Sequence, residues 1–361
     1  MTFGLIGCGR ISTNHILAAC NNHLSISGVC DIIPERMELL LSKHNLNHDS
    51  SIRRYTDYRR MLDECRPELA AICTESGNHA SIALDCIDAG CNLIIEKPIA
   101  LSLKDADEII KRAQQKNVLV CACHQNRFNP SIQYIRGALE EGRFGKLSHG
   151  CVHVRWSRQQ NYYTQASWRG TWAQDGGALM NQSIHGIDLL RWMMGDGIEE
   201  VFAYTARQFH PYLECEDVGL AVIKFKNGAL GTVEGTTNVF PKNLEESLYL
   251  FGENGTVKAG GTSANTIDVW QFTDEHPEDA LLKNGLQEQI SNVYGNGHIA
   301  LYADMIDAIQ SKRPPYVDAL AGKRALELVL AIYKSAATGK PVTLPLGDYS
   351  TVEAGRTNSF C

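Results

Sequence analysis

The triplet Glu96-Lys97-Pro98 is the segment of this chain whose residue types most clearly suggest chemistry. It follows the apolar run Asn92–Ile95, which predicts a short buried strand. A lysine that ends such a strand, with proline restricting its backbone, delivers one amine to a crevice. There the amine can donate to a substrate oxygen or relay a proton, with Glu96 orienting it. An ordinary surface Lys-Pro turn is the alternative interpretation.

A second candidate segment runs from Gly176 to Asp188. If it is helical, Asn181 and His185 share a face at i,i+4, and Asp188 lies one turn beyond. The pair Gly176-Gly177 would leave space for a ligand at the helix start. A histidine with a near-neutral pKa suits removal of a hydroxyl proton while a hydride leaves the same carbon. A histidine satisfied within the core is the alternative, and the presence of Lys97 favours the catalytic role.

A glycine loop near the N-terminus indicates a dinucleotide site. Gly7-Cys8-Gly9-Arg10-Ile11 follows an apolar strand and precedes a helix, with Ser12 in place of a third glycine. Asp31 ends the next strand, about 20 residues later, where a carboxylate accepts the ribose hydroxyls. The same carboxylate would repel a 2′-phosphate, so we expect NAD. The alternative for the loop is a tight turn without a ligand. The alternatives for Asp31 are a carboxylate that stabilises the turn at the end of the strand and a cap for the helix that begins near Pro34.

Loops after neighbouring strands are expected to add cofactor contacts. Ligands of open α/β sheets lie outside the carboxyl ends of the strands. We therefore expect contacts from Thr74, Ser76, His79, Glu96, Lys97 and Gln125. Thr74 and Ser76 could instead cap the helix that follows.

A stretch rich in arginine and aromatic residues precedes the histidine segment. Arginine grips carboxylate or phosphate groups bidentately, and aromatic rings stack on sugars or bases. We therefore predict that the substrate is bound by Asn181, His185 and six residues of this stretch: Arg155, Arg158, Tyr162, Tyr163, Trp168 and Arg169. A subunit interface has the same composition and is the alternative.

The elements around these residues predict an α/β protein of two domains. Residues 1–124 alternate short apolar strands with amphipathic helices, which is typical of a doubly wound parallel sheet of the Rossmann type. Residues 125–350 predict an α+β domain with an open, mostly antiparallel sheet, for substrate binding and oligomerisation. Residues 351–361 are polar and predict a flexible tail.

Composition excludes several classes of function. With 44% hydrophobic residues, 21% charged residues and a net charge of −7, the chain is typical of a globular protein without a footprint for nucleic acid or anionic membrane. We find no signal peptide and no apolar run of about 20 residues. The 12 cysteines form no CxxC pair, so we expect reduced thiols, a cytoplasmic location and no metal site.

Taken together, the glycine loop, Asp31, Leu93–Pro98 and the Asn181/His185 spacing resemble the glucose–fructose oxidoreductase / inositol dehydrogenase / rhizopine catabolism family. The resemblance spans nearly the whole chain. It implies a nicotinamide cofactor, polyol, sugar or sugar-nucleotide substrates, and dimers or tetramers formed through the C-terminal sheet. It also implies Lys97 and His185 as the catalytic pair, supported by Asn181.

The histidine segment and its arginine-rich approach are similar to one branch of that family. This branch oxidises C3 of UDP-N-acetylglucosaminuronic acid in bacterial surface-polysaccharide synthesis. Three other functions remain open: a dehydrogenase of a free polyol or inositol, a reductase of a keto-sugar, and a non-catalytic sensor of NAD or a sugar.

Asn181 departs from the family pattern, because many members carry aspartate at this position. Asparagine can orient His185 but cannot stabilise its protonated form as a carboxylate would. Either Lys97 takes a larger share of the proton relay or Asp188 compensates.

Overall fold

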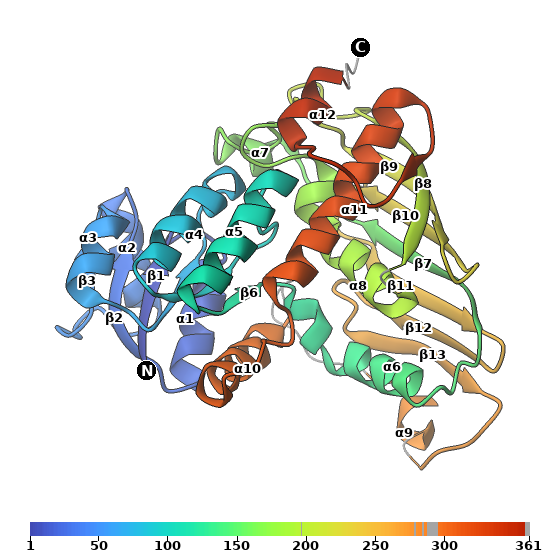
Figure 1. The fold of residues 1–361 in the computed structure, drawn as a ribbon, viewed down its shortest axis with the longest axis horizontal. Coiled ribbons are helices and arrows are strands. Elements are labelled where there is room, and N and C mark those ends of the chain that lie inside the picture. Colours follow the sequence, from blue (N-terminus) through green and yellow to red (C-terminus); the bar gives the residue numbers. More distant parts are fainter. Residues whose placement is uncertain (196, 278, 284, 287–294, 358–361) are drawn as a thin grey trace. The chain divides into compact units, whose positions relative to one another are not determined.

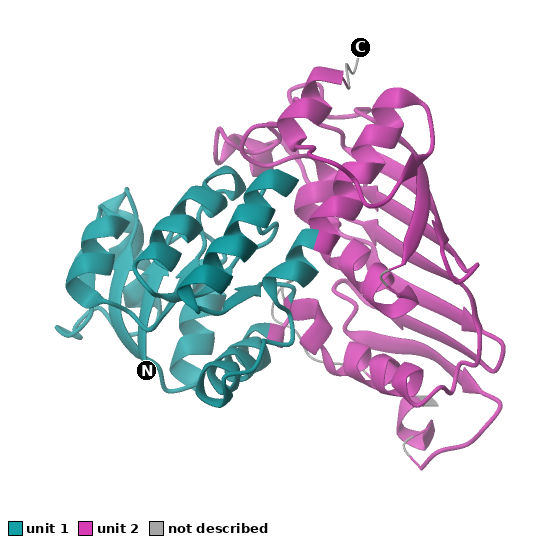
Figure 2. Ribbon diagram, in the orientation of Figure 1, with its two compact units in different colours: residues 1–124, 298–323 teal, residues 125–297, 324–361 magenta. Residues whose placement is uncertain are grey.

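The computed structural model describes residues 1–195, 197–277, 279–283, 285–286 and 295–357. The chain forms two compact units, coloured separately in Figure 2. One holds residues 1–124 and 298–323, and the other holds residues 125–297 and 324–361. Among the residues described, no helix is both long and apolar enough to span a membrane.

The first unit contains a six-stranded sheet in the order β3-β2-β1-β4-β5-β6, in which every neighbouring pair is parallel. This order confirms the predicted Rossmann type. The strands are β1 Thr2–Ile6, β2 Ser25–Cys30, β3 Arg53–Tyr55, β4 Leu69–Ile72, β5 Asn92–Ile95 and β6 Val120–Ala122. We did not predict β3, because a three-residue edge strand with two arginines has no apolar signal.

Helices connect these strands (Figure 1): α1 Ser12–Asn21, α2 Pro34–Lys43, α3 Tyr58–Cys65, α4 His79–Asp88 and α5 Leu103–Lys116, with a 3₁₀ turn at Ser76–Asn78. The helix α5 shows how the sequence sets their bounds. Ser102 caps its start by accepting the N–H of Asp105, and Asn117 ends it in the left-handed region at φ 54°.

Residues 298–323 belong to the first unit, whereas the sequence analysis placed them in the second domain. They include most of α10 (Gly297–Ser311) and the start of α11 (Ala319–Thr338). Tyr302 is fully buried and packs edge-on against Phe3, with ring centroids 5.8 Å apart. The Ala122 N–H donates to the Val317 carbonyl at 3.0 Å, which ties this segment to β6. Such long-range packing leaves no local sequence signal.

The second unit is built on an eight-stranded, mostly antiparallel sheet in the order β13-β12-β11-β7-β10-β9-β8-β14, with β7 and β10 parallel. Its strands are β7 Leu147–Arg155, β8 Ile198–Ala206, β9 Val218–Phe225, β10 Leu230–Thr236, β11 Glu245–Gly252, β12 Gly255–Gly260, β13 Thr266–Phe272 and β14 Val342–Thr343. Its other elements are a 3₁₀ turn at Gln125–Phe128, α6 Pro130–Glu140, α7 Gln160–Thr164, a π-helical turn at Ala178–Gln182, α8 Ile184–Met194, α9 Asp279–Lys283 and α12 Thr351–Thr357.

The two faces of this sheet differ. Helix α8 packs on one face, where a Cβ built on Gly186 would lie 2.7 Å from Val152 and one built on Gly150 would lie 3.0 Å from Leu190. The opposite face carries exposed apolar side chains at Tyr204, Leu220, Val222 and Leu230.

The C-terminal tail is more ordered than its polar sequence predicts. Residues 351–357 form α12, and the Thr351 hydroxyl donates to the Trp172 carbonyl at 2.6 Å. Ala354 is fully buried, and a Cβ on Gly355 would lie 2.5 Å from the Trp172 ring. The prediction of a flexible tail is therefore wrong for residues 351–357, and residues 358–361 lie outside the described part of the chain.

Candidate active site

The loops predicted to bind the cofactor follow the carboxyl ends of neighbouring strands in the first unit. Backbone N–H groups bridge these ends, from Gly7 to the Cys30 carbonyl (2.8 Å), from Cys73 to Ile6 (2.7 Å) and from Glu96 to Ile72 (3.0 Å). This edge therefore carries the glycine loop, Asp31, Thr74 and Lys97. It is the edge at which open α/β sheets bind their ligands.

The two glycines of the loop do different work. Gly7 has φ +93°, and a Cβ there would lie 2.7 Å from the Cys73 carbonyl carbon, so it admits the end of β4. A Cβ on Gly9 would meet nothing within 4 Å. No side chain caps the start of α1, and among its first N–H groups that of Asn14 donates to the Ile11 carbonyl at 2.9 Å. An open Gly9 beside an uncapped helix start fits a cofactor pyrophosphate.

Asp31 is buried beside this loop. Its Oδ2 accepts the Cys8 N–H at 2.8 Å, and its Oδ1 accepts the Ile33 N–H at 2.9 Å. Arg36 lies 3.9 Å from Oδ1. The carboxylate thus serves as a turn group, as the alternative held, and also lies next to the loop, where a ribose would be bound.

His79 ties two loops together. Its Nδ1 lies 2.7 Å from the Pro98 carbonyl, and its Nε2 lies 3.1 Å from the Thr74 carbonyl. Burial lowers the pKa of His79, although the two carbonyls act in the opposite direction. Both ring nitrogens face backbone oxygens, so the structure gives His79 a bracing role instead of the predicted cofactor contact. Ser76 is buried and Thr74 half-buried on the same loop.

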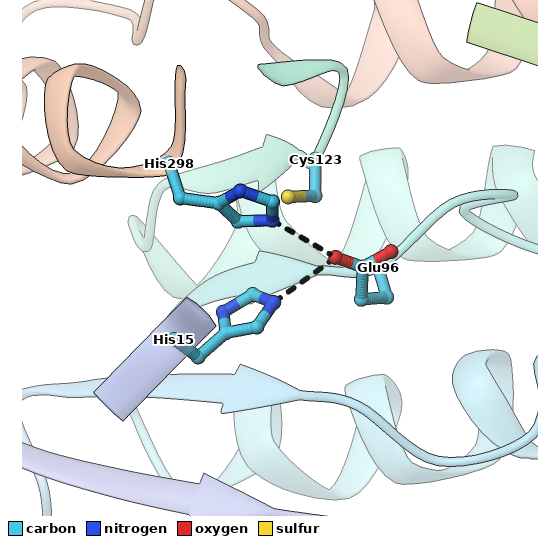
Figure 3. A group of neighbouring side chains, drawn as sticks. All are labelled: His15, Glu96, Cys123 and His298. Atoms are coloured by element: carbon cyan, nitrogen blue, oxygen red, sulfur yellow. Dashed lines mark hydrogen bonds and ion pairs between the residues drawn. The ribbon is translucent and has the colours of Figure 1, made fainter. Parts of the chain in front are cut away.

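The Glu96 carboxylate points into a buried cluster, drawn in Figure 3. Its Oε1 lies 3.0 Å from Nε2 of His15 and 3.6 Å from Nε2 of His298. Its Oε2 accepts the backbone N–H of Lys97 at 3.2 Å. Burial alone would raise the pKa of Glu96, but the hydrogen bond with His15 and the nearby His298 ring outweigh burial and hold the pKa well below the ordinary value. Glu96 therefore fixes the peptide of Lys97, not the amine as predicted.

The same cluster has the composition of a metal site. His15, Glu96, Cys123 and His298 each offer a ligand atom within 4.8 Å of the others. Burial, followed by the charge of Glu96, raises the pKa of the Cys123 thiol well above its ordinary value, whereas zinc binds the thiolate. Tyr302 lies 2.7 Å from Nδ1 of His15, which leaves Nε2 to donate to Glu96 if the ring is neutral. We assign the cluster as a hydrogen-bond network.

In the second unit, the segment with Asn181 and His185 is not one continuous helix. Ala178–Gln182 form a π-helical turn, and α8 begins only at Ile184, so His185 lies in its first turn. The amide of Asn181 donates to Oδ1 of Asp175, a contact that the sequence analysis missed. A π-helical turn at this point agrees with a functional role, since such turns are frequent at functional sites.

The glycine pair makes room for protein, not for a ligand as predicted. A Cβ on Gly177 would lie 1.9 Å from Oε2 of Glu216, and one on Gly176 would lie 2.6 Å from Cβ of Met180. Burial raises the pKa of Glu216 to about 8, against the bonds it accepts from the Leu179 N–H and the Tyr333 hydroxyl. These contacts hold the π-helical turn in place.

Asp188 is not placed to compensate for Asn181. Both of its oxygens accept from Arg127, at 2.6 and 2.7 Å, and Arg191 lies 3.4 Å from Oδ1. All three side chains are buried. Burial lowers the pKa of Arg191 to about 10, and the charge of Asp188 opposes that shift. Asp188 is thus the anion of a structural ion pair, and the suggestion that it supports His185 is wrong.

The predicted substrate arginines fall into two groups. Arg155 lies on the sheet face opposite to α8, because its neighbour Val154 packs under that helix. It forms ion pairs with Glu234 at 2.5 Å and Glu245 at 2.6 Å. Arg155 therefore does not join His185, and its predicted substrate role is a misassignment caused by ignoring the strand's alternation.

Arg158 and Arg169 gather around Tyr162. Their guanidinium carbons lie 5.1 and 3.9 Å from the centre of its ring. The Tyr162 hydroxyl lies 3.4 Å from the amide of Gln182, in the turn that carries Asn181. Within the part of the chain that the structure describes, neither arginine pairs with a carboxylate, and Nε of each is buried without a hydrogen-bond partner. These two cations are thus held beside the turn without protein counter-ions.

The remaining predicted residues have varied positions. Trp168 lies under Arg169, whose guanidinium carbon is 5.3 Å from its ring centre. Tyr163 is buried, and its hydroxyl donates to Thr237 at 3.3 Å, so it packs within the second unit. Gln125 is buried at the start of the second unit, with its amide 3.3 Å from the Asn126 side chain.

Comparison with known proteins gives the family. Residues 1–124 match the description "Oxidoreductase family, NAD-binding Rossmann fold", and residues 136–344 match "Oxidoreductase family, C-terminal alpha/beta domain". The chain belongs to the GFO/IDH/MocA family. This member of the family is an oxidoreductase, and its cofactor is NAD.

Solved structures and curated relatives extend this result. The chain is 35% identical to the WlbA dehydrogenase of Bordetella pertussis, solved in complex with NADH and UDP-GlcNAcA, with a TM-score of 0.85 over 96% of this chain and 99% of that one. The Chromobacterium violaceum WlbA complex with the same two molecules is also 35% identical, with a TM-score of 0.86 over 96% of each chain. Myo-inositol 2-dehydrogenase of Thermotoga maritima is 25% identical over 95% of this chain and 98% of its own.

Proposed function

We propose that this family member oxidises C3 of UDP-N-acetylglucosaminuronic acid, with NAD as the acceptor. The observation that carries the proposal is the pair Arg158 and Arg169, stacked on Tyr162 without a carboxylate partner among the described residues. Buried guanidinium Nε groups suit a diphosphate or carboxylate, which a nucleotide-linked uronic acid supplies. The 35% identity to WlbA supports the same substrate class.

Two residues perform the proposed reaction. His185 accepts the proton of the C3 hydroxyl at a ring nitrogen, and Lys97 donates a hydrogen bond to the same oxygen as its negative charge develops. NAD, when bound, supplies the carbon that accepts the hydride from C3. The hydroxyl carbon becomes a ketone as it loses one hydride to NAD and its oxygen loses one proton to His185. Gly7, Gly9 and Asp31 would hold the cofactor, with Thr74 and Ser76 beside it.

A neutral polyol is the second candidate substrate, since the chain resembles myo-inositol 2-dehydrogenase over 95% of its length. A panel that pairs NAD with UDP-N-acetylglucosaminuronic acid, UDP-N-acetylglucosamine, myo-inositol and D-glucose separates the two. We expect reduced nicotinamide only with the uronic acid nucleotide. A higher kcat/KM for myo-inositol than for the uronic acid nucleotide would instead indicate a polyol dehydrogenase. Absence of turnover with all four compounds would favour a non-catalytic sensor of NAD or a sugar.

We also propose that the chain self-associates through the open face of its second sheet. Tyr204, Leu220, Val222 and Leu230 are each more than half exposed on adjacent strands of this face. An apolar patch of this kind is typical of a protein interface. Light scattering should give a dimer or tetramer, and Leu220→Asp combined with Val222→Asp should lower the mass. A monomeric parent protein would contradict this proposal.

We further propose a cytoplasmic enzyme that contributes to surface-polysaccharide biosynthesis. No two cysteines among the described residues form a disulfide, as expected in a reducing compartment. Cell fractionation should recover the enzyme and its keto-sugar product with the cytosol, and recovery in the periplasmic fraction would argue against this location.

A further inference from the structure

Asn181 and Asp175 form a pair in which one residue supplies an amide and the other a carboxylate. The Asn181 amide donates to Oδ1 of Asp175, while Oδ2 accepts the Gly170 N–H at 2.8 Å. Asp175 is only 2% exposed, so its charge is screened weakly by water. A buried carboxylate thus lies six residues before Asn181 and contacts its side chain.

This contact fixes the orientation of the Asn181 amide. A carboxylate only accepts hydrogen bonds, so the NH₂ end must face Asp175 and the carbonyl Oδ1 must face away. Gln182 donates to that Oδ1 at 3.2 Å, and its amide also lies 3.4 Å from the Tyr162 hydroxyl. The Asn181 carbonyl is therefore a positioned acceptor, polarised by the charge behind it.

The pair also explains why asparagine stands here. An aspartate at position 181 would bring two carboxylates into hydrogen-bond contact, and one of them would have to take up a proton. The two positions together have room for one negative charge. In this chain the charge lies at position 175.

We propose that Asp175 is the carboxylate of the reaction centre and acts through Asn181 as a positioning residue. The inference rests on the proposed function, in which His185 gains a proton. Asp175 holds Asn181 in the orientation that supports His185, and it provides the negative charge that favours the protonated imidazole. It replaces Asp188, which is occupied by Arg127.

Three variants test this role: Asp175→Asn, Asn181→Asp, and both together. Asp175→Asn keeps an acceptor for the Gly170 N–H but removes the charge, and we expect kcat to fall about 100-fold with KM little changed. The kcat of Asn181→Asp alone should fall by a similar factor, because its two adjacent carboxylates compete for one proton. The double variant moves the charge to position 181 and restores a pair of one amide and one carboxylate, so it should regain kcat to within about tenfold of the parent.

The double variant decides between catalysis and structure. A merely structural contact would change the melting temperature of the single variants and leave kcat of the folded fraction unchanged, which would overturn the inference. Failure of a folded double variant to regain activity would also overturn it. If Asp175→Asn does not fold, the kcat of the double variant is compared with that of Asn181→Asp, and a higher kcat in the double variant supports the same conclusion. Normal turnover in His185→Ala would instead refute the proposed function, whatever Asp175 does.

Discussion

The backbone N–H of Lys97 donates to Oε2 of Glu96 at 3.2 Å, and the other oxygen of that carboxylate lies 3.0 Å from His15. The side chain of Glu96 thus points into the core. Its carboxylate holds the backbone N–H of Lys97 at the start of the loop that follows β5. The Glu96 carboxylate therefore links the buried histidines to the backbone of Lys97. In the proposed reaction, this network sets the position of the Lys97 backbone.

Replacing Lys97 should remove most of the turnover. Lys97→Ala should lower kcat by about 10²- to 10⁴-fold, because a group that stabilises the substrate oxygen in the transition state is lost. Lys97→Arg keeps the charge and should lose less, and the exposed Lys104→Ala should behave as the parent. Steady-state kinetics with reduced nicotinamide as the readout measures all three. Near-normal turnover of Lys97→Ala would remove the lysine from the mechanism.

The stability of the protein should fall in mild acid because of His298. Burial lowers the pKa of His298 below its ordinary value of 6.5, in spite of Glu96. The unfolded chain therefore binds this proton more readily than the folded one. The contribution is fully present above pH 6.5 and is lost as the pH falls toward the lowered pKa, so the melting temperature should drop there.

His298→Gln should make this drop shallower, and the exposed His48→Gln should not. The effect will be partial, because the pKa of the buried His79 is lowered in the same direction. Thermal melts between about pH 7 and pH 5 measure the difference. An equal drop in His298→Gln and the parent would show that His298 does not titrate as its surroundings indicate.

The two loop glycines should separate folding from cofactor binding. Gly7→Ala should destabilise the protein by at least about 1–2 kcal/mol, because residue 7 has a positive φ that alanine rarely adopts. The added Cβ would also lie only 2.7 Å from the Cys73 carbonyl carbon. Gly9→Ala meets no atom within 4 Å and should fold normally. It should nonetheless weaken NAD binding at least about tenfold, because the methyl group occupies the space of the pyrophosphate. Calorimetric titration with NAD and melting temperatures distinguish the two effects, and normal affinity in Gly9→Ala would contradict the placement of the pyrophosphate.

The arginines should differ in how they affect substrate affinity. Arg158→Ala and Arg169→Ala should each raise KM for UDP-N-acetylglucosaminuronic acid about 10- to 100-fold, since each loses a charge-assisted bond to an anion. Arg155→Ala is the matched control, because Glu234 and Glu245 already neutralise that side chain on the opposite face of the sheet. Unchanged KM in Arg158→Ala and Arg169→Ala would favour a neutral sugar.

Much of the fold could be predicted from local patterns. The strands of the first unit with continuous apolar runs, such as Asn92–Ile95, were found, since burial on both faces leaves such runs. The edge strand Arg53–Tyr55 and the return of residues 298–323 to the first unit were not, because pairing at an edge and packing across about 300 residues of sequence have no local signature.

The candidate site was predicted in outline only. The sequence indicated the motifs of Lys97 and His185, but it did not show that the carboxylate of Glu96 faces inward or that Gly177 admits Glu216. Asp175 was missed because six residues and a π-helical turn separate it from Asn181, a spacing that matches no regular period. The strand's alternation at Arg155 was available from the sequence and should have placed that residue on the other face of the sheet.

Transfer of the C3 hydrogen tests the central claim most directly. The enzyme is incubated with NAD and UDP-N-acetylglucosaminuronic acid that carries deuterium at C3, and the nicotinamide product is examined by mass spectrometry. The account predicts one deuterium in the reduced nicotinamide and a nucleotide sugar that has lost that deuterium and one proton. Unlabelled reduced nicotinamide, or none while another sugar is oxidised, would contradict it.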